Sequence, residues 1–262
     1  MIITDDFVML NLPKTGSTFA RKAIRTAYGQ HKISRLLSKI QLIHPCVIDL
    51  ATPNLDFLGG RGGEQKNQHG VLRQIPKEHK NKPIVSITRN PFSRYVSAYT
   101  YKSWQNKQRF SQYPNFPNLS FAEFYQMKQD IDAKQRLHGI HPKIPLGFYT
   151  VQFIQFYFAQ PEKVLKKIDN HYIESEQFKN DMSDISFLQQ ENLNQDLGNF
   201  LAEKGIPSKK LAFLKDAKKI NVALGDKDFW QFYTPKLIEQ VLERDKLLFK
   251  IFPQYLPTSN KN

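Results

Sequence analysis

Two short apolar runs, at residues 7–12 and 83–88, dominate the hydrophobic pattern of the first hundred residues. Each has the length of a buried strand, and each is followed by a turn and by apolar residues at helical spacing. After the first run, residues 19–28 place their apolar side chains on one helical face, and Gly29 suits the position just past a helix. After the second, Pro91 suits the first turn of a helix. The pattern predicts two strand–turn–helix units of an α/β protein.

Further helix signals occur in three later segments, at residues 120–135, 191–204 and 235–250. Ser120 and Glu123 form a capping box at the start of the first. Residues 147–160 are rich in aromatic side chains and fit either a strand or a helix, because period alone does not separate the two. We expect a P-loop-like α/β fold in which helices flank a central, mostly parallel sheet of about four or five strands. We expect one domain over residues 1–262.

The turn after the first strand, residues 13–18 (PKTGST), has the features of an anion-binding loop. A tight turn that enters a helix leaves backbone N–H groups without partners, and the helix dipole favours negative charge at the same point. Lys14 adds a cation, and Ser17 and Thr18 add hydroxyl groups. The Gly-x-x-x-x-Gly-Lys-Ser/Thr spacing of a Walker A loop is absent. Taken alone, the segment fits either an anion site or an ordinary strand–helix turn that contains a lysine.

A second polar segment, residues 89–99 (RNPFSRYVSAY), follows the second strand. Arg89 stands at the carboxyl end of that strand, and Ser97 lies about two helical turns further on. Ligands of open parallel sheets bind beyond the carboxyl ends of the strands, so both polar segments are expected at one edge of the sheet. An arginine fork and a serine hydroxyl suit a phosphate group, although Arg-Asn-Pro also fits a purely structural helix start.

Together, the two segments resemble the sulfotransferases that use 3′-phosphoadenosine 5′-phosphosulfate (PAPS). Residues 13–19 (PKTGSTF) resemble the 5′-phosphosulfate loop of that family, and residues 89–99 resemble its 3′-phosphate motif, R-(D/N)-P-x-x-R-x-x-S-x-Y. The match is to the carbohydrate and membrane-type branch with its bacterial members. Residues 191–197 (ENLNQDL) are similar to the family's strand-to-helix segment, E-x-L-x-x-D. The resemblance implies the sulfotransferase fold and PAPS-dependent sulfotransferase activity.

The resemblance also implies a role for each motif residue. Lys14 is expected to donate to the oxygen that bridges the sulfuryl group and the 5′-phosphate, where charge develops during in-line transfer. Arg89 and Ser97 are expected to bind the 3′-phosphate and so to select PAPS over ATP. The 5′-phosphate is assigned to the amides of Thr15, Gly16, Ser17, Thr18 and Phe19. A sulfuryl group carries less charge than a γ-phosphoryl group, so no metal is required, and the sequence has no metal-ligand spacing.

The acceptor hydroxyl needs a general base with a pKa near the working pH, which favours histidine. Among the seven histidines the resemblance favours His69, because many family members carry a Lys/His segment at a similar distance before the 3′-phosphate strand. Gly70 beside it allows close approach of the backbone to a ligand. A structural or substrate-contacting role is the alternative for His69, and Glu64 is the second candidate base. Lys66 fits either a contact to the sulfuryl oxygens or a solvated lysine.

Composition adds an electrostatic argument. The net charge is +14 and the pI is about 9.7, which suits an anionic ligand such as PAPS or an acidic glycan, and suits nucleic acid equally well. Cys46 is the single cysteine, so no intrachain disulfide forms, and we expect its side chain to be buried. The sequence shows neither a signal peptide nor an apolar stretch that spans a bilayer, and we expect a cytoplasmic, bacterial enzyme.

The acceptor is less defined than the donor. A carbohydrate comes first by resemblance, with lipid, small alcohol and peptide left open. Residues 101–116 are an aromatic-rich loop whose rings either stack on the acceptor or fill the core. Lys218 and Lys219 fit either a late contact to the 3′-phosphate or a solvated pair. The oligomeric state is open.

Two other functions compete with sulfuryl transfer. A P-loop kinase or nucleotide hydrolase needs a Walker A lysine and an acidic Mg²⁺ ligand on a neighbouring strand, and neither is evident. A non-catalytic protein that binds nucleic acid or another polyanion explains the charge but gives no reason for two motifs at strand ends. We therefore expect no nucleic-acid partner.

Overall fold

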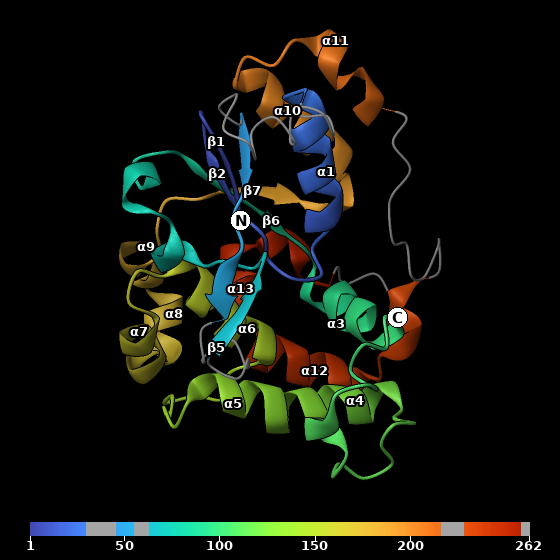
Figure 1. Ribbon diagram of the computed structural model, residues 1–262. Helices are drawn as coiled ribbons and strands as arrows, with labels where there is room; N and C mark the ends of the chain where they lie inside the picture. Colours follow the sequence, from blue (N-terminus) through green and yellow to red (C-terminus); the bar gives the residue numbers. More distant parts are fainter. Residues whose placement is uncertain (30–45, 55–62, 216–227, 258–262) are drawn as a thin grey trace. The chain divides into compact units, whose positions relative to one another are not determined.

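The computed structural model describes residues 1–29, 46–54, 63–215 and 228–257 (Figure 1). The chain forms two compact units, each built from three separate segments. Unit 1 contains the described parts of Met1–Asn54, Glu64–Arg89 and Asp184–Val222, and unit 2 those of Leu55–Gly63, Asn90–Ser183 and Ala223–Asn262. The single domain predicted over residues 1–262 stays a prediction.

The main sheet of unit 1 has five strands in the order β3-β1-β2-β6-β7. Their bounds are β1 Ile2–Thr4, β2 Val8–Leu10, β3 Val47–Asp49, β6 Ile84–Thr88 and β7 Ser186–Gln189. β2 pairs with β6 and β6 pairs with β7 in parallel, whereas β1 is antiparallel to both β2 and β3. The α/β prediction with four or five strands is confirmed, and the sheet is mixed.

The antiparallel edge has a simple cause. Only residues 5–7 separate β1 from β2, and a connection of this length allows a hairpin but no parallel crossover. Thr4 closes the turn, because its hydroxyl accepts hydrogen bonds from the amides of Asp6 and Phe7 at 3.2 and 3.0 Å. Cys46, next to the edge strand β3, is exposed, so the prediction that it is buried was wrong.

Helices α1 (Ser17–Ala27), α10 (Leu193–Glu203) and α11 (Ser208–Leu211) share one hydrophobic core with this sheet (Figure 1). The predicted apolar face of α1 is buried. Tyr28 ends the helix, and Gly29 follows with φ 67°, as expected for a residue just past a helix. A separate two-stranded sheet pairs β4 (Thr52–Asn54) with β5 (Gly63–Asn67).

Unit 2 is helical in its described part (Figure 1). Its α-helices are α3 Pro91–Thr100, α4 Phe121–Met127, α5 Lys134–Leu137, α6 Phe148–Tyr157, α7 Pro161–Lys167, α8 Asn170–Glu174, α9 Phe178–Asp181, α12 Pro235–Arg244 and α13 Lys246–Ile251. A π-helix, η5 (Lys128–Ala133), joins α4 to α5, and short 3₁₀ helices include η4 (Gln108–Phe110) and η8 (Phe229–Phe232).

The helix predicted over residues 120–135 is present in this unit as α4, η5 and the start of α5, whereas the one predicted over residues 191–204 is α10 of unit 1. Ser120 and Glu123 form the expected capping box at α4. The segment that fitted either a strand or a helix is α6, and all ten of its residues are buried, which explains why it shows no amphipathic period. In the loop of residues 101–116, Trp104 and Phe110 are buried, so these two rings fill the core.

The helix predicted over residues 235–250 is broken at Asp245, which joins α12 to α13. Its fully buried carboxylate accepts hydrogen bonds from the Tyr95 hydroxyl at 2.9 Å and from the Thr150 amide and hydroxyl at 2.9 and 2.8 Å. Burial raises the pKa of Asp245. One carboxylate therefore ties together α3, α6 and the α12–α13 junction. No helix of the described residues is both long and apolar enough to span a membrane.

Candidate functional site

The segment between β2 and α1 is a tight turn with two residues in the left-handed region. Lys14 has φ 67° and Gly16 has φ 87°, and the Thr15 side chain between them is buried, with its hydroxyl donating to the Leu12 carbonyl oxygen at 2.9 Å. The turn reverses the chain so that α1 starts at Ser17. The parallel register aligns Leu10 of β2 with Ser86 of β6, which brings the segments after both strands to one edge of the sheet.

The start of α1 exposes its helix dipole without a capping side chain. The N-cap residue, Gly16, has no side chain to accept a hydrogen bond from the first turn, and the first turn contains no acidic residue. The amides of Ser17 and Thr18 have no partner within the helix by geometry. The Phe19 amide donates to the Gly16 carbonyl oxygen at 3.0 Å, so its assignment to a phosphate stays a prediction. An uncapped helix start of this kind favours an anionic ligand.

Two features of the structure favour glycine at position 16. Its φ of 87° is costly for any residue with a Cβ atom. A Cβ added there would also lie 2.9 Å from Cδ2 of Leu193, the first residue of α10. The turn is therefore seated directly on α10, and the two segments that resemble one family meet in the structure.

Two basic side chains meet beside this turn. Nη1 of Arg89, which directly follows β6, donates to the Lys14 carbonyl oxygen at 3.1 Å. Burial and, second, the positive charge of Arg89 lower the pKa of Lys14 to about 8. Because each cation disfavours the charge of the other, an anion bound here stabilises both.

His69 is held at the same edge by Asn11, which directly follows β2, and by Asn67 of β5. Its Nδ1 lies 2.7 Å from the Asn11 carbonyl oxygen, and its amide donates to Oδ1 of Asn67 at 2.6 Å. A carbonyl oxygen only accepts, so Nδ1 carries the hydrogen, and in the neutral ring Nε2 is the basic nitrogen. The structure thus brings Lys14, Arg89 and His69 to one edge of unit 1.

Asn11 is a residue that the sequence analysis missed. It is fully buried, its side-chain Nδ2 donates to the Gln68 carbonyl oxygen at 3.0 Å, and its Oδ1 has no hydrogen-bond partner within the described ranges. Asn11 therefore holds the His69 segment through both its carbonyl oxygen and its side chain. The available signal was one amide side chain inside an otherwise apolar run, residues 7–12.

The other predicted residues near His69 are less informative. Gly70 packs closely, but against protein: an added Cβ would lie 2.5 Å from Cε of Met1 and 3.0 Å from Thr52. Glu64 lies in β5, and Lys66 is exposed on the same strand. Lys218 and Lys219 lie outside the described residues.

Ser97 belongs to unit 2, because the chain passes from unit 1 to unit 2 between Arg89 and Asn90. The Asn90 side chain caps α3 by accepting from the Phe92 amide at 2.9 Å, and Pro91 occupies the first turn as predicted. Ser97 follows about two turns later and is buried.

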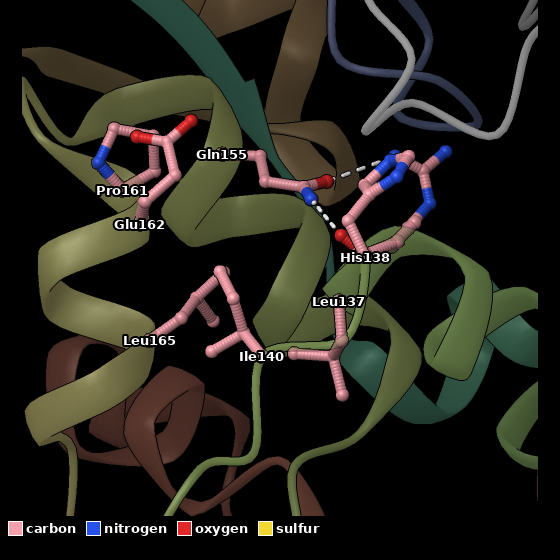
Figure 2. Close-up of a pocket in the computed structure, with 8 residues that line it drawn as sticks. Leu137, His138, Ile140, Gln155, Pro161, Glu162 and Leu165 are labelled. Atoms are coloured by element: carbon pink, nitrogen blue, oxygen red, sulfur yellow. Dashed lines mark hydrogen bonds between the residues drawn. The ribbon is translucent and has the colours of Figure 1, made fainter.

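A cavity of about 170 Å³ lies in unit 2 and contains none of the predicted site residues (Figure 2). Leu137, Ile140 and Leu165 form its apolar wall. Across the parts of the chain that the structure describes, no group of three or more His, Cys, Asp or Glu residues is placed to hold a metal ion.

Comparison with known proteins gives a match to a family. The sequence model described as the sulfotransferase family matches residues 2–212. Among solved structures, the chain is similar to mouse sulfotransferase SULT7A1 complexed with PAP, with 16% identity, a TM-score of 0.43, and coverage of 98% of this chain and 86% of that chain. No curated protein sequence matches.

Two glycine variants test the seat of the turn. We expect Gly16→Ala to lower the free energy of unfolding by about 2–3 kcal/mol, through the left-handed backbone and the contact with Leu193. Gly29→Ala is the matched control, because its φ is 67° and nothing lies within 4 Å of an added Cβ. It should lose only about 1 kcal/mol. Equal losses in urea unfolding would show that the contact with α10 contributes nothing.

Proposed function

The chain belongs to the sulfotransferase family, and from this premise we propose that the enzyme transfers a sulfuryl group from PAPS to a hydroxyl group of a carbohydrate. The observation that carries the proposal is the joint position of Lys14, Arg89 and His69 at one sheet edge, beside the uncapped start of α1. Two cations and a helix dipole suit an anionic donor, and a histidine with Nδ1 protonated suits an acceptor hydroxyl.

The donor is bound through its two phosphate positions. The amides of Ser17 and Thr18 hold the 5′-phosphate, with the helix dipole behind them. Arg89 binds the 3′-phosphate through its guanidinium fork, and Ser97 stays assigned to the same phosphate by its motif. Because ATP has no 3′-phosphate, Arg89 distinguishes PAPS from it.

The transfer step uses one base and one cation. Nε2 of His69 accepts the proton of the acceptor hydroxyl while the hydroxyl oxygen attacks the sulfur atom of PAPS. The bond between sulfur and the bridging oxygen breaks, and the electron pair leaves with 3′-phosphoadenosine 5′-phosphate (PAP). The Lys14 ammonium donates to that oxygen as its charge develops. No step here calls on a metal ion, and a cytoplasmic location stays a prediction.

Nucleotide selectivity is the first test. In thermal unfolding without Mg²⁺, we expect PAP to raise the melting temperature strongly, and AMP and ATP to have little effect, because only PAP carries the 3′-phosphate. Arg89→Ala should weaken PAP binding at least tenfold, since a charge-assisted pair is lost, while Arg73→Ala, an exposed arginine of the same unit, should not. Equal responses to PAP and AMP would contradict PAPS as donor and favour a nucleotide hydrolase or a general polyanion binder.

Loss of the base should separate chemistry from binding. We expect His69→Ala to reduce kcat at least a hundredfold and to leave the dissociation constant of PAP unchanged, because the imidazole acts on the acceptor. Transfer of ³⁵S from labelled PAPS to a carbohydrate panel measures the first quantity, and calorimetry the second. His141→Ala, at an exposed histidine, is the control. A fully active His69→Ala enzyme would move the base to Glu64.

The lowered pKa of Lys14 predicts a pH dependence. The ammonium must be protonated to donate, and its pKa of about 8 means that the protonated fraction falls as pH rises above 8. We expect kcat/KM for PAPS to decline above about pH 8, and kcat to decline at higher pH, because bound donor stabilises the ammonium. Lys14→Arg should remove this decline, since guanidinium stays charged. An unchanged alkaline limb in Lys14→Arg would refute the assignment.

A further inference from the structure

A group of basic side chains in unit 2 has no role in the proposed transfer. Lys107 and Arg109 lie in the loop before α4, Lys128 begins the π-helix η5, and Arg136 lies in α5. These four residues are called the basic cluster below. Asp132 of η5 is the carboxylate at its centre: it pairs with the Lys128 ammonium, and its Oδ1 lies 2.7 Å from Nη2 of Arg109.

The cluster holds more positive charge than its carboxylate neutralises. Lys128, Asp132 and Arg136 are each less than 10% exposed, and buried charges are costly unless paired. Asp130, the other acid of η5, is engaged elsewhere: it accepts from Nε2 of Gln126 at 3.0 Å and lies 4.0 Å from Nζ of Lys134. Three of the cations, Lys107, Arg109 and Lys128, therefore face the single carboxylate of Asp132.

The aromatic ring of Phe148 and the amide of Gln155 contact the two inner cations. The Lys128 ammonium lies 3.5 Å from the centre of the Phe148 ring, and the Arg136 guanidinium carbon lies 4.9 Å from it. Nη1 of Arg136 also donates to Oε1 of Gln155 at 3.1 Å, a hydrogen bond drawn in Figure 2. These contacts hold the positive charges of Lys128 and Arg136 in place on the inner side of the cluster.

The two outer cations keep unused donors where solvent reaches. Arg109 directs both Nε and Nη2 to one oxygen, Oδ1 of Asp132, at 3.1 and 2.7 Å, so its remaining N–H groups have no bond to any described residue. Lys107 is half-buried, and its ammonium makes no hydrogen bond or ion pair with a residue that the structure describes. Burial and the charges of Arg109 and Arg136 lower its pKa.

We propose that the basic cluster is a binding site for an oxyanion, a sulfate or carboxylate group. The Lys107 ammonium and the remaining N–H groups of Arg109 donate to the oxyanion. The positive charges of Lys128 and Arg136 attract it electrostatically from behind. The group is either a free ion or part of an acidic acceptor. The existence of this oxyanion site does not depend on the proposed transfer. Only the second source, an acidic acceptor, rests on the proposed function.

The test compares variants, because sulfate also stabilises proteins without binding. Sodium sulfate is titrated into the PAP-saturated protein at constant ionic strength, and thermal unfolding gives the apparent affinity. We expect saturable stabilisation of the wild type and about tenfold weaker sulfate binding in Lys107→Gln, for the loss of one charge-assisted contact. Lys163→Gln, an exposed lysine of α7 with the same charge change, should match the wild type. Identical titrations of both variants and the wild type would overturn the site.

Thermal shifts with two oligosaccharides distinguish the two sources of the oxyanion. A Lys107-dependent shift with an unsulfated uronate tetrasaccharide, absent with maltotetraose, would show that the group is carried by an acidic sugar. A Lys107-dependent shift with sulfate alone would show a free-ion site. An equal Lys107-dependent shift with maltotetraose would contradict an oxyanion site. Failure of PAP to bind would count against the proposed donor. The difference in sulfate binding between Lys107→Gln and Lys163→Gln could still be measured and would test the oxyanion site separately.

Discussion

The left-handed turn at Gly16 is the constraint on which the candidate site depends. It sets where α1 starts, and its contact with Leu193 seats the turn on the first residue of α10. That helix is itself fixed to the sheet, because the Asp196 carboxylate accepts a hydrogen bond from the amide of Gln189, the last residue of β7, at 2.7 Å. The turn between β2 and α1 therefore rests, through α10, on β7, the strand that pairs with β6. Residues 13–19 and 191–197 therefore lie together in the structure although the sequence separates them.

Two lysines with a similar pKa show how differently the fold treats positive charge. Burial is the largest cause of the lowered pKa for both Lys14 and Lys128, and both reach about 8. The second cause has the opposite sign: Arg89 lowers the pKa of Lys14 further, whereas Asp132 raises that of Lys128. Lys128 thus has a carboxylate of the protein to support its charge, while the ammonium of Lys14 gains most from an anion that binds.

The elements that the sequence predicted are encoded by residues that lie close together in the chain. The strands at residues 7–12 and 83–88 and the helices that follow them carry their periodicity, caps and turn residues within a few positions. The break at Asp245 carries no proline or glycine signal, because it depends on Tyr95 and Thr150, which are distant in the sequence. The bond between His69 and Asn11 joins residues 58 positions apart and is equally invisible. β1 was missed because three apolar-rich residues are too short a run to predict a strand.

The motif at residues 89–99 contains two arginines whose surroundings in the structure differ. Arg89 is half-buried at the end of β6, whereas Arg94 is buried in unit 2, where its guanidinium lies 3.9 Å from the centre of the Tyr149 ring and donates to Gln152. The Tyr149 hydroxyl donates back to the Arg94 carbonyl oxygen at 3.1 Å. Arg94 therefore serves folding, whereas ligand binding by Arg89 stays a prediction. Because the Arg94 guanidinium must reach Gln152 and Tyr149 from the first turn of α3, this position of the motif is set by packing within unit 2.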